Sequence, residues 1–128
     1  MADQPEFNIG ELAREFAVTT RTIRHYEDIG LLKPMRRGQN RVYSPADRTR
    51  LKLILRGKRL GFSLDESRAI VDLYDPAHGN KEQLQALLAG IQQQRDKLNA
   101  QLSDIHQMLS SLDDAEENCR KALMQSRQ

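Results

Sequence analysis

The chain has 128 residues and carries 20 Lys and Arg against 18 Asp and Glu, a net charge of +2. This small total hides an asymmetry, because residues 1–62 have 13 basic and 7 acidic side chains while residues 63–128 have 7 basic and 11 acidic ones. A basic half followed by an acidic half favours contact of the first half alone with a polyanion, although an ordinary solvated surface would explain the same charges.

The composition excludes several classes of protein. Cys119 is the one cysteine, which excludes an intramolecular disulfide framework and any CxxC zinc or redox motif. The chain has no Ser/His/Asp or Cys/His constellation and no phosphate-binding glycine loop, so we predict that it is not an enzyme. The polar first residues and the lack of an apolar run of about 18 residues predict a soluble cytoplasmic protein with no membrane partner.

Two short helices are predicted at the start of the chain. Apolar residues at positions 9, 12, 13 and 16 have helical spacing, and Asn8 with Glu11 forms a capping-box pattern before them. A second helix is predicted from Thr20 to about Ile29, and Gly30 ends it. Such a pair is either a helix-turn-helix or a plain helical hairpin.

The polar face of the second helix decides between these two readings. Thr20, Arg21, Arg24 and His25 lie on the outward side of its N-terminal half. A recognition helix presents side chains to base edges in the major groove from that position. A purely structural helix would more often carry Glu/Lys pairs there, so the pattern favours DNA readout.

A small β-hairpin wing is predicted over residues 34–43, with Gly38 in its turn. Its tip and edge carry Arg36, Arg37, Asn40 and Arg41. Adjacent arginines on a polar turn suit contact with DNA phosphates. Taken alone, this segment would be interpreted as an exposed basic loop.

Two further helices are predicted after the wing. Ser44 caps a third helix that runs to Leu60, and Ser63 caps a fourth helix that runs to about Tyr74. The surface of the third helix is strongly basic. The turn at residues 58–63 is basic and precedes a helix N-terminus, which predicts a phosphate site.

The second half of the chain has a different periodicity. Apolar residues alternate steps of four and three over about four heptads, interrupted by Arg95, which predicts a coiled-coil seam. The seam consists of Leu84, Leu88, Ile91, Leu98, Leu102, Ile105, Leu109 and Leu112. The chain offers no second helix of comparable length, so we predict a homodimer. The heptads leave parallel and antiparallel pairing open.

The predicted fold class is mainly α, a winged helix-turn-helix DNA-binding domain followed by a long coiled-coil dimerisation helix. The predicted organisation is a DNA-binding domain at residues 1–75, a linker at 76–80, a dimerisation helix at 81–113 and a short C-terminal tail at 114–128.

Three stretches resemble the MerR family of transcription regulators. They are IGELAREFAVTTRTIRHYEDIGLLKP at 9–34, RVYSPAD at 41–47 and LILRGKRLGFSLDE at 53–66. The resemblance implies a dimer with an antiparallel coiled coil that binds a palindromic element of double-stranded promoter DNA. It also implies that the dimer distorts the spacer between the −35 and −10 boxes, which realigns them for RNA polymerase.

The resemblance also assigns roles to individual residues. It places Arg21, Arg24 and His25 in the major groove, with Thr20 and Tyr26 near the DNA or its backbone. It places Arg37, Asn40, Arg41 and Tyr43 at wing positions that contact phosphates. Lys58 and Arg59 match a second wing.

The sequence leaves open which effector such a regulator would sense. Many relatives sense metals through cysteines at both ends of the long helix, a pattern that this chain lacks. Cys119 continues the heptad column and is predicted to be a small core residue. His106 lies 13 residues before it, about 20 Å along a helix, so these two residues cannot share a metal within one chain. We predict no metal and no cofactor.

Two alternatives stay open: an architectural DNA-bending protein without an effector, which would show broad sequence tolerance and steep salt dependence, and a metal-responsive sensor. The stretch LKLILRGKRLGFSLDE at 51–66, LYD at 73–75 and the ending ENCRKAL at 117–123 resemble a shorter branch that controls genes of branched-chain amino acid and isovalerate catabolism. That branch implies a small-molecule effector such as an acyl-CoA.

Overall fold

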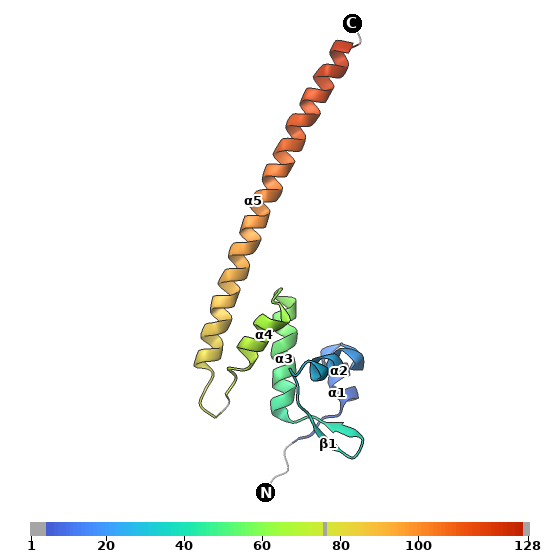
Figure 1. Ribbon diagram of the computed structural model, residues 1–128, viewed down its shortest axis with the longest axis vertical. Coiled ribbons are helices and arrows are strands. Elements are labelled where there is room, and N and C mark those ends of the chain that lie inside the picture. The colour runs from blue at the N-terminus through green and yellow to red at the C-terminus, as the bar shows by residue number, and fades with distance from the viewer. Residues whose placement is uncertain (1–4, 76, 127–128) are drawn as a thin grey trace. The chain divides into compact units, whose positions relative to one another are not determined.

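The computed structural model describes residues 5–75 and 77–126. The chain divides into two compact units, one that reaches Gly90 and one that starts at Ile91 (Figure 1). The elements in chain order are α1 (Ile9–Phe16), α2 (Thr20–Asp28), β1 (Met35–Arg37), β2 (Asn40–Val42), α3 (Pro45–Arg59), α4 (Leu64–Val71) and α5 (Lys81–Ser126). This confirms the predicted fold class. Within the described residues, no helix has the length and apolar character needed to cross a membrane.

Side chains cap the helices of the first unit as the sequence predicts. Asn8 Oδ1 accepts a hydrogen bond from the Glu11 backbone N–H at 2.8 Å, and the Glu11 carboxylate accepts one from the Asn8 N–H at 3.1 Å. Ser44 with Asp47 and Ser63 with its third helical residue form the same box at α3 and α4. Each box satisfies backbone donors that the first turn leaves unpaired, which defines where the helix begins.

One apolar core holds the first unit together. Leu12 of α1, Ile23 of α2 and Leu51 of α3 each have no exposed surface. Burying such a side chain stabilises a fold by about 1.5–3 kcal/mol. The remaining buried members are Ala13, Tyr26, Leu31, Leu32, Tyr43, Ile54 and Val71. The core therefore joins the first four helices and the end of the wing.

The close approach of α3 and α4 depends on a glycine. A Cβ on Gly57, in the middle of α3, would lie 2.4 Å from Ser67 Oγ and 3.5 Å from the Phe62 ring. Ser67 is itself 3% exposed. A larger residue at position 57 would push the two helices apart, which explains why a poor helix former stands here.

The wing is a two-stranded antiparallel hairpin in which Arg36 pairs with Arg41. Gly38 occupies the first turn position with φ +67°, a conformation that L side chains rarely adopt. After β2, the backbone groups of Tyr43 and Phe7 exchange two hydrogen bonds of 2.9 Å. This bridge fastens the N-terminal segment to the base of the wing.

The predicted helix ends differ from the observed ones in the second part of the chain. α4 ends at Val71, three residues before the predicted Tyr74, since Tyr74 N–H bonds to Val71 O in a turn. α5 continues past residue 113 to Ser126, so the stretch expected to be a separate tail is helical as far as it is described. Residues 113–126 contain neither Gly nor Pro, so nothing in their sequence breaks the helix.

The first turns of α5 pack within the first unit. Gln83 is 3% exposed, and a Cβ on Gly90 would lie 3.2 Å from the Phe62 ring and 3.6 Å from Ile70. Beyond Ile91 the described apolar side chains of α5 are exposed. Leu98, for example, is 54% exposed.

Candidate nucleic-acid interface

The second helix of the helix-turn-helix presents a polar face to solvent. Thr19 caps α2 by accepting a hydrogen bond from the Thr22 N–H at 3.1 Å. Ile23 and Tyr26 point into the core, which turns the opposite face outward. That outward face carries the exposed side chains of Arg21, Arg24 and His25, with half-buried Thr20 beside them. The core therefore fixes the orientation of the helix and of its polar face.

Arg24 has a partner on its own helix. Its Nη2 donates to Thr20 Oγ1 at 3.3 Å. This bond is exposed and joins two residues four positions apart, so it orients the guanidinium along the surface of α2 without burying it. Arg21 has no polar partner among the described residues.

Two of the expected DNA-contact residues lie in the core. Tyr26 is 3% exposed and Tyr43 is fully buried, and burial raises the pKa of both phenols above the usual value. The Tyr43 hydroxyl finds no hydrogen-bond partner among the described atoms. Both rings support the surface from beneath, Tyr26 under α2 and Tyr43 at the base of the wing.

Carboxylates hold the arginines of the wing. Both terminal nitrogens of Arg37 donate to Glu6, at 3.0 Å each. Glu27, on the last turn of α2, accepts from Arg36 Nη2 at 3.0 Å and from Arg41 Nε. The bond to Glu27 raises the pKa of the Arg41 guanidinium. Because Arg36 and Arg41 are directly opposed in the hairpin, Glu27 offsets the repulsion between two like charges and ties the wing to α2.

The second predicted wing is the loop after α3. Lys58 and Arg59 are exposed at the C-terminal end of α3, where basic residues complement the helix dipole. The predicted phosphate site at the start of α4 stays a prediction. Asp65 and Glu66 stand in the first turn of this helix, and the capping box occupies the backbone donors of Ser63 and Glu66. The positive charge of this loop comes from Lys58 and Arg59 alone.

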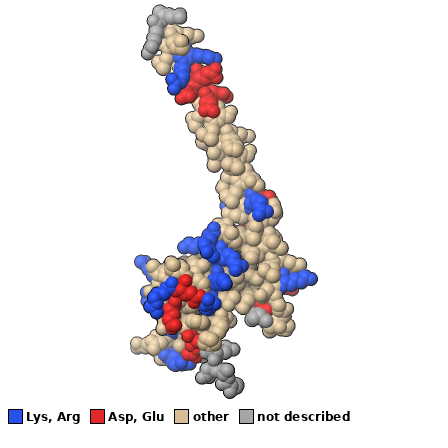
Figure 2. Space-filling view, turned by 180° about the vertical axis from the view of Figure 1, so that it is seen from behind, with Lys and Arg blue, Asp and Glu red and all other residues tan. Residues whose placement is uncertain are grey.

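A hollow joins α2 to this loop. Arg21 and His25 line it on one side and Lys58 on the other, with Thr22, Tyr26, Phe62, Leu64 and Ser67 between them. The structure thus brings together residues from two of the three predicted contact regions. Figure 2 shows Lys and Arg gathered over the first unit, with a group of Asp and Glu among them.

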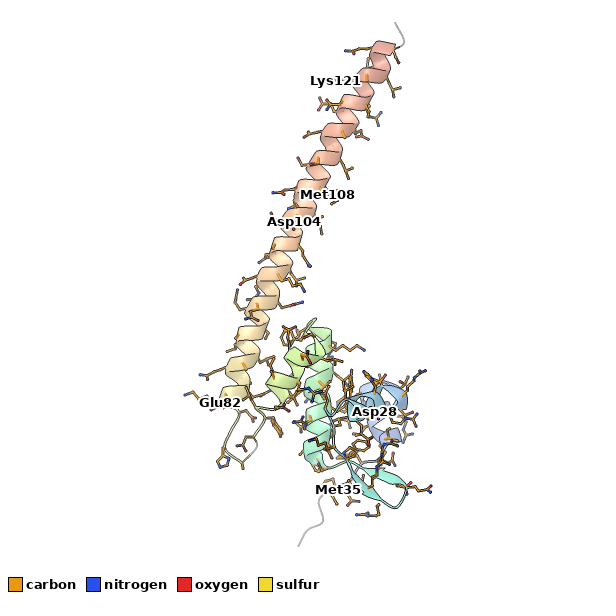
Figure 3. The ribbon with its side chains drawn as sticks, viewed as in Figure 1. Asp28, Met35, Glu82, Asp104, Met108 and Lys121 are labelled. Carbon is orange, nitrogen blue, oxygen red and sulfur yellow. The ribbon has the colours of Figure 1, made fainter. Side chains whose placement is uncertain are left out.

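The contacts of Glu6 and Glu27 carry no signal in the sequence. Glu6 lies 31 positions from Arg37, and Glu27 lies 9 and 14 positions from its two arginines. These separations follow no helix or strand period, so only the folded chain reveals these pairs. In Figure 3, the labelled Asp28 directly follows Glu27 in the chain, and the labelled Met35 directly precedes Arg36.

The described residues hold no group of three or more metal-ligating side chains. His78 Nδ1 lies 2.7 Å from an Asp75 oxygen in the segment before α5. Cys119 is exposed on α5.

A helix-turn-helix with an exposed basic second helix, flanked by a β-hairpin, defines the winged helix-turn-helix class of DNA-binding domains. Two family models match the chain: "MerR HTH family regulatory protein" over residues 7–73 and "MerR, DNA binding" over residues 48–115. The chain belongs to the MerR family. This confirms the resemblance on the three quoted stretches.

Known relatives include regulators of several kinds. The chain is 37% identical over 113 residues to the transcriptional activator TipA of Streptomyces coelicolor, which covers 87% of this chain and 41% of TipA. The chain thus spans less than half of that relative.

Two solved structures are similar to this fold. The N-terminal part of Mta, a multidrug transporter activator of Bacillus subtilis, has a TM-score of 0.66 and 31% identity, and the match covers 85% of this chain and 96% of that one. PbrR691 of Ralstonia metallidurans, solved in complex with lead(II), has a TM-score of 0.62 and 33% identity over 83% of this chain and 84% of its own. These relatives are regulators rather than enzymes.

Proposed function

We propose that this chain regulates transcription by binding promoter DNA in a sequence-specific way. One observation carries the proposal: Arg21, Arg24 and His25 are exposed on a helix whose other face is locked in the core. A side chain on a fixed element can discriminate bases because its donors are already placed. Arginine is suited to this task because its fork of donors matches the O6 and N7 acceptors of guanine.

The remaining surface residues would hold the DNA backbone. In this proposal Arg37 and Asn40 of the wing and Lys58 and Arg59 of the second wing contact phosphates, with Thr20 at the edge of the groove. Arg41, Tyr43 and Tyr26 act by supporting these residues, since all three are mostly or fully buried. Phosphate contacts set the register of the protein on the duplex and make binding salt-dependent.

The active form would be a homodimer joined through α5. Seven of the eight predicted seam residues are at least half exposed, from Leu102 at 50% to Leu88 at 66%. An exposed apolar stripe of this length on one helix indicates an interface. A dimer would offer two recognition helices to the two halves of a palindromic site.

The switch would act on DNA shape. We propose that the dimer distorts the spacer between two promoter boxes so that RNA polymerase engages both, as the family resemblance implies. The energy of bending would be offset by contacts of both α2 helices and both wings. An effector would bias this equilibrium through its different affinity for the two DNA conformations.

We further propose a small-molecule effector from branched-chain amino acid or isovalerate catabolism, such as an acyl-CoA. The support is the resemblance of residues 51–66, 73–75 and 117–123 to the branch that controls those genes. Transcription and DNA affinity that stay constant across a panel of such metabolites would remove this part of the proposal.

The test of DNA recognition is fluorescence-anisotropy binding to the promoter upstream of the protein's own gene, compared with scrambled DNA. We expect a preference of about 10³-fold or more. The Arg24→Ala variant should lower promoter affinity by about 10–100-fold and reduce the preference. Arg14→Ala, which removes the same charge from the exposed face of α1, is the matched control and should keep the preference. Equal affinity of wild type for both duplexes would favour an architectural role.

A further inference from the structure

The arginines of the wing and those of α2 differ in their partners. Arg36, Arg37 and Arg41 are each paired with a glutamate. Arg21 and Arg24 have no acidic partner among the described residues. The wing therefore enters any encounter with DNA partly neutralised, whereas the recognition helix does not.

The two glutamates hold their arginines in different environments. The side chains of Arg37 and Glu6 are 71% and 50% exposed, while those of Arg41 and Glu27 are 23% and 15% exposed. An exposed ion pair is weak and exchanges partners readily. A part-buried pair with two arginines on one carboxylate is held by its surroundings and resists exchange.

The position of Glu6 follows from the backbone. The bridge between Phe7 and Tyr43 fixes the chain beside the base of the wing. Phe7 packs against the core, and successive side chains of an extended segment alternate in direction, so Glu6 points the other way. There it meets the exposed fork of Arg37 with both of its oxygens.

We infer that Glu6 is an intramolecular competitor for DNA phosphate at Arg37, and that Glu27 is a positioning residue that keeps the wing attached to α2. The two Glu6 oxygens occupy the same pair of donors that a phosphate would use. A phosphate that binds Arg37 must displace this carboxylate, which then lies beside the polyanion. Contact at the wing is therefore weak unless other contacts hold the complex, which lowers the affinity for non-specific DNA. This inference rests on the proposed function.

The experiment compares Glu6→Gln with Glu27→Gln, two variants with the same change in charge and shape. Binding to a labelled mixed-sequence DNA duplex is measured by anisotropy over a salt series, with folding checked by circular dichroism. Glu6→Gln should raise affinity on the order of 2–5-fold. It should also steepen the slope of log K against log salt by up to about 0.9, because one more phosphate is neutralised. Glu27→Gln should lower affinity because the wing loses its anchor.

A double-mutant cycle with Arg37→Ala assigns the effect to the pair. In that background Glu6→Gln should change neither affinity nor salt slope. An equal gain in DNA affinity from Glu6→Gln and Glu27→Gln would overturn the inference. Such a gain would follow from the change in net charge alone and would not require the ion pair between Glu6 and Arg37. A gain that persists without Arg37 would overturn it as well. If Glu27→Gln does not fold, the cycle on Glu6 and Arg37 decides by itself.

Different results would contradict the proposed DNA binding and the competition of Glu6 with phosphate at Arg37. Folded wild-type protein that does not bind the duplex even at low salt would contradict DNA binding itself. Wild-type protein that binds while Glu6→Gln is unchanged in affinity and slope would contradict only the competition at Arg37.

Discussion

The first unit and α5 use their apolar residues in opposite ways. The helices of the first unit enclose theirs, so that Leu12, Ile23 and Leu51 have no exposed surface. α5 keeps Leu102 and Leu109 half exposed along its length. The charged groups differ too, since the first unit is basic on its surface while residues 113–117 of α5 carry four acidic side chains.

This difference separates folding from assembly. The described residues of the first unit enclose an apolar core of their own. We propose that the apolar stripe of α5 gains its stabilisation from a second copy of the chain, because most helical stability in proteins comes from packing. Variants in the core of the first unit should therefore lower the stability of the fold, whereas variants in the apolar stripe of α5 should impair assembly.

The largest effect is expected from a charge in the α5 seam. Leu102→Asp would place an uncompensated carboxylate in a dimer interface, which costs several kcal/mol. We expect monomers in analytical ultracentrifugation, with DNA affinity lower by about 10²-fold or more because the two half-sites are no longer bound together. The control is Gln107→Asp, which adds the same charge away from the seam. Dimers of Leu102→Asp with unchanged affinity would show that the seam is not the interface.

The next effect concerns the packing of α3 on α4. Gly57→Ala should lower the free energy of unfolding by about 1–3 kcal/mol, since the new methyl group overlaps Ser67 Oγ. Adding Ser67→Ala removes that oxygen and should restore most of the loss. Urea denaturation followed by circular dichroism measures both variants. An equal loss in the single and double variants would mean that the glycine serves some purpose other than close approach.

The smallest effect is a dependence of stability on pH. Arg48 donates hydrogen bonds to Glu15 and lowers the pKa of this carboxyl below its ordinary value of 4.5, against an opposing effect of burial. The stabilisation by the charged carboxylate is therefore complete above pH 4.5 and disappears as the pH falls through the lowered pKa. The free energies of unfolding of wild type and Glu15→Gln should differ near neutral pH and converge in acid.

Arg48 provides the control for this dependence. In an Arg48→Gln background, the pH dependence of the difference between Glu15 and Glu15→Gln should shrink, because only the weaker effects of burial and Lys52 on the pKa of Glu15 remain. A pH dependence that is as large without Arg48 would assign it to another pair.

The local features of the fold could be predicted from sequence because each depends on neighbouring residues. The capping boxes at Asn8 and Ser63 and the turn at Gly38 are set by chemistry within four positions. The heptads that begin at Leu84 likewise indicate one continuous apolar stripe. The outward face of α2 followed from the 3.6-residue period, which places Arg21 and Arg24 opposite Ile23 and Tyr26.

Tertiary structure decided which of the predicted contact residues are available. The family resemblance places Tyr26 and Tyr43 at the DNA, yet their rings lie in the core. Arg37 and Arg41 have the same charge and lie in the same hairpin, yet one is exposed and the other part-buried. The two tyrosines pack in the apolar core, while Arg37 pairs with Glu6 and Arg41 with Glu27, which lie far away along the chain. Burial and ion pairing between distant segments depend on how the elements pack, and no local pattern records them.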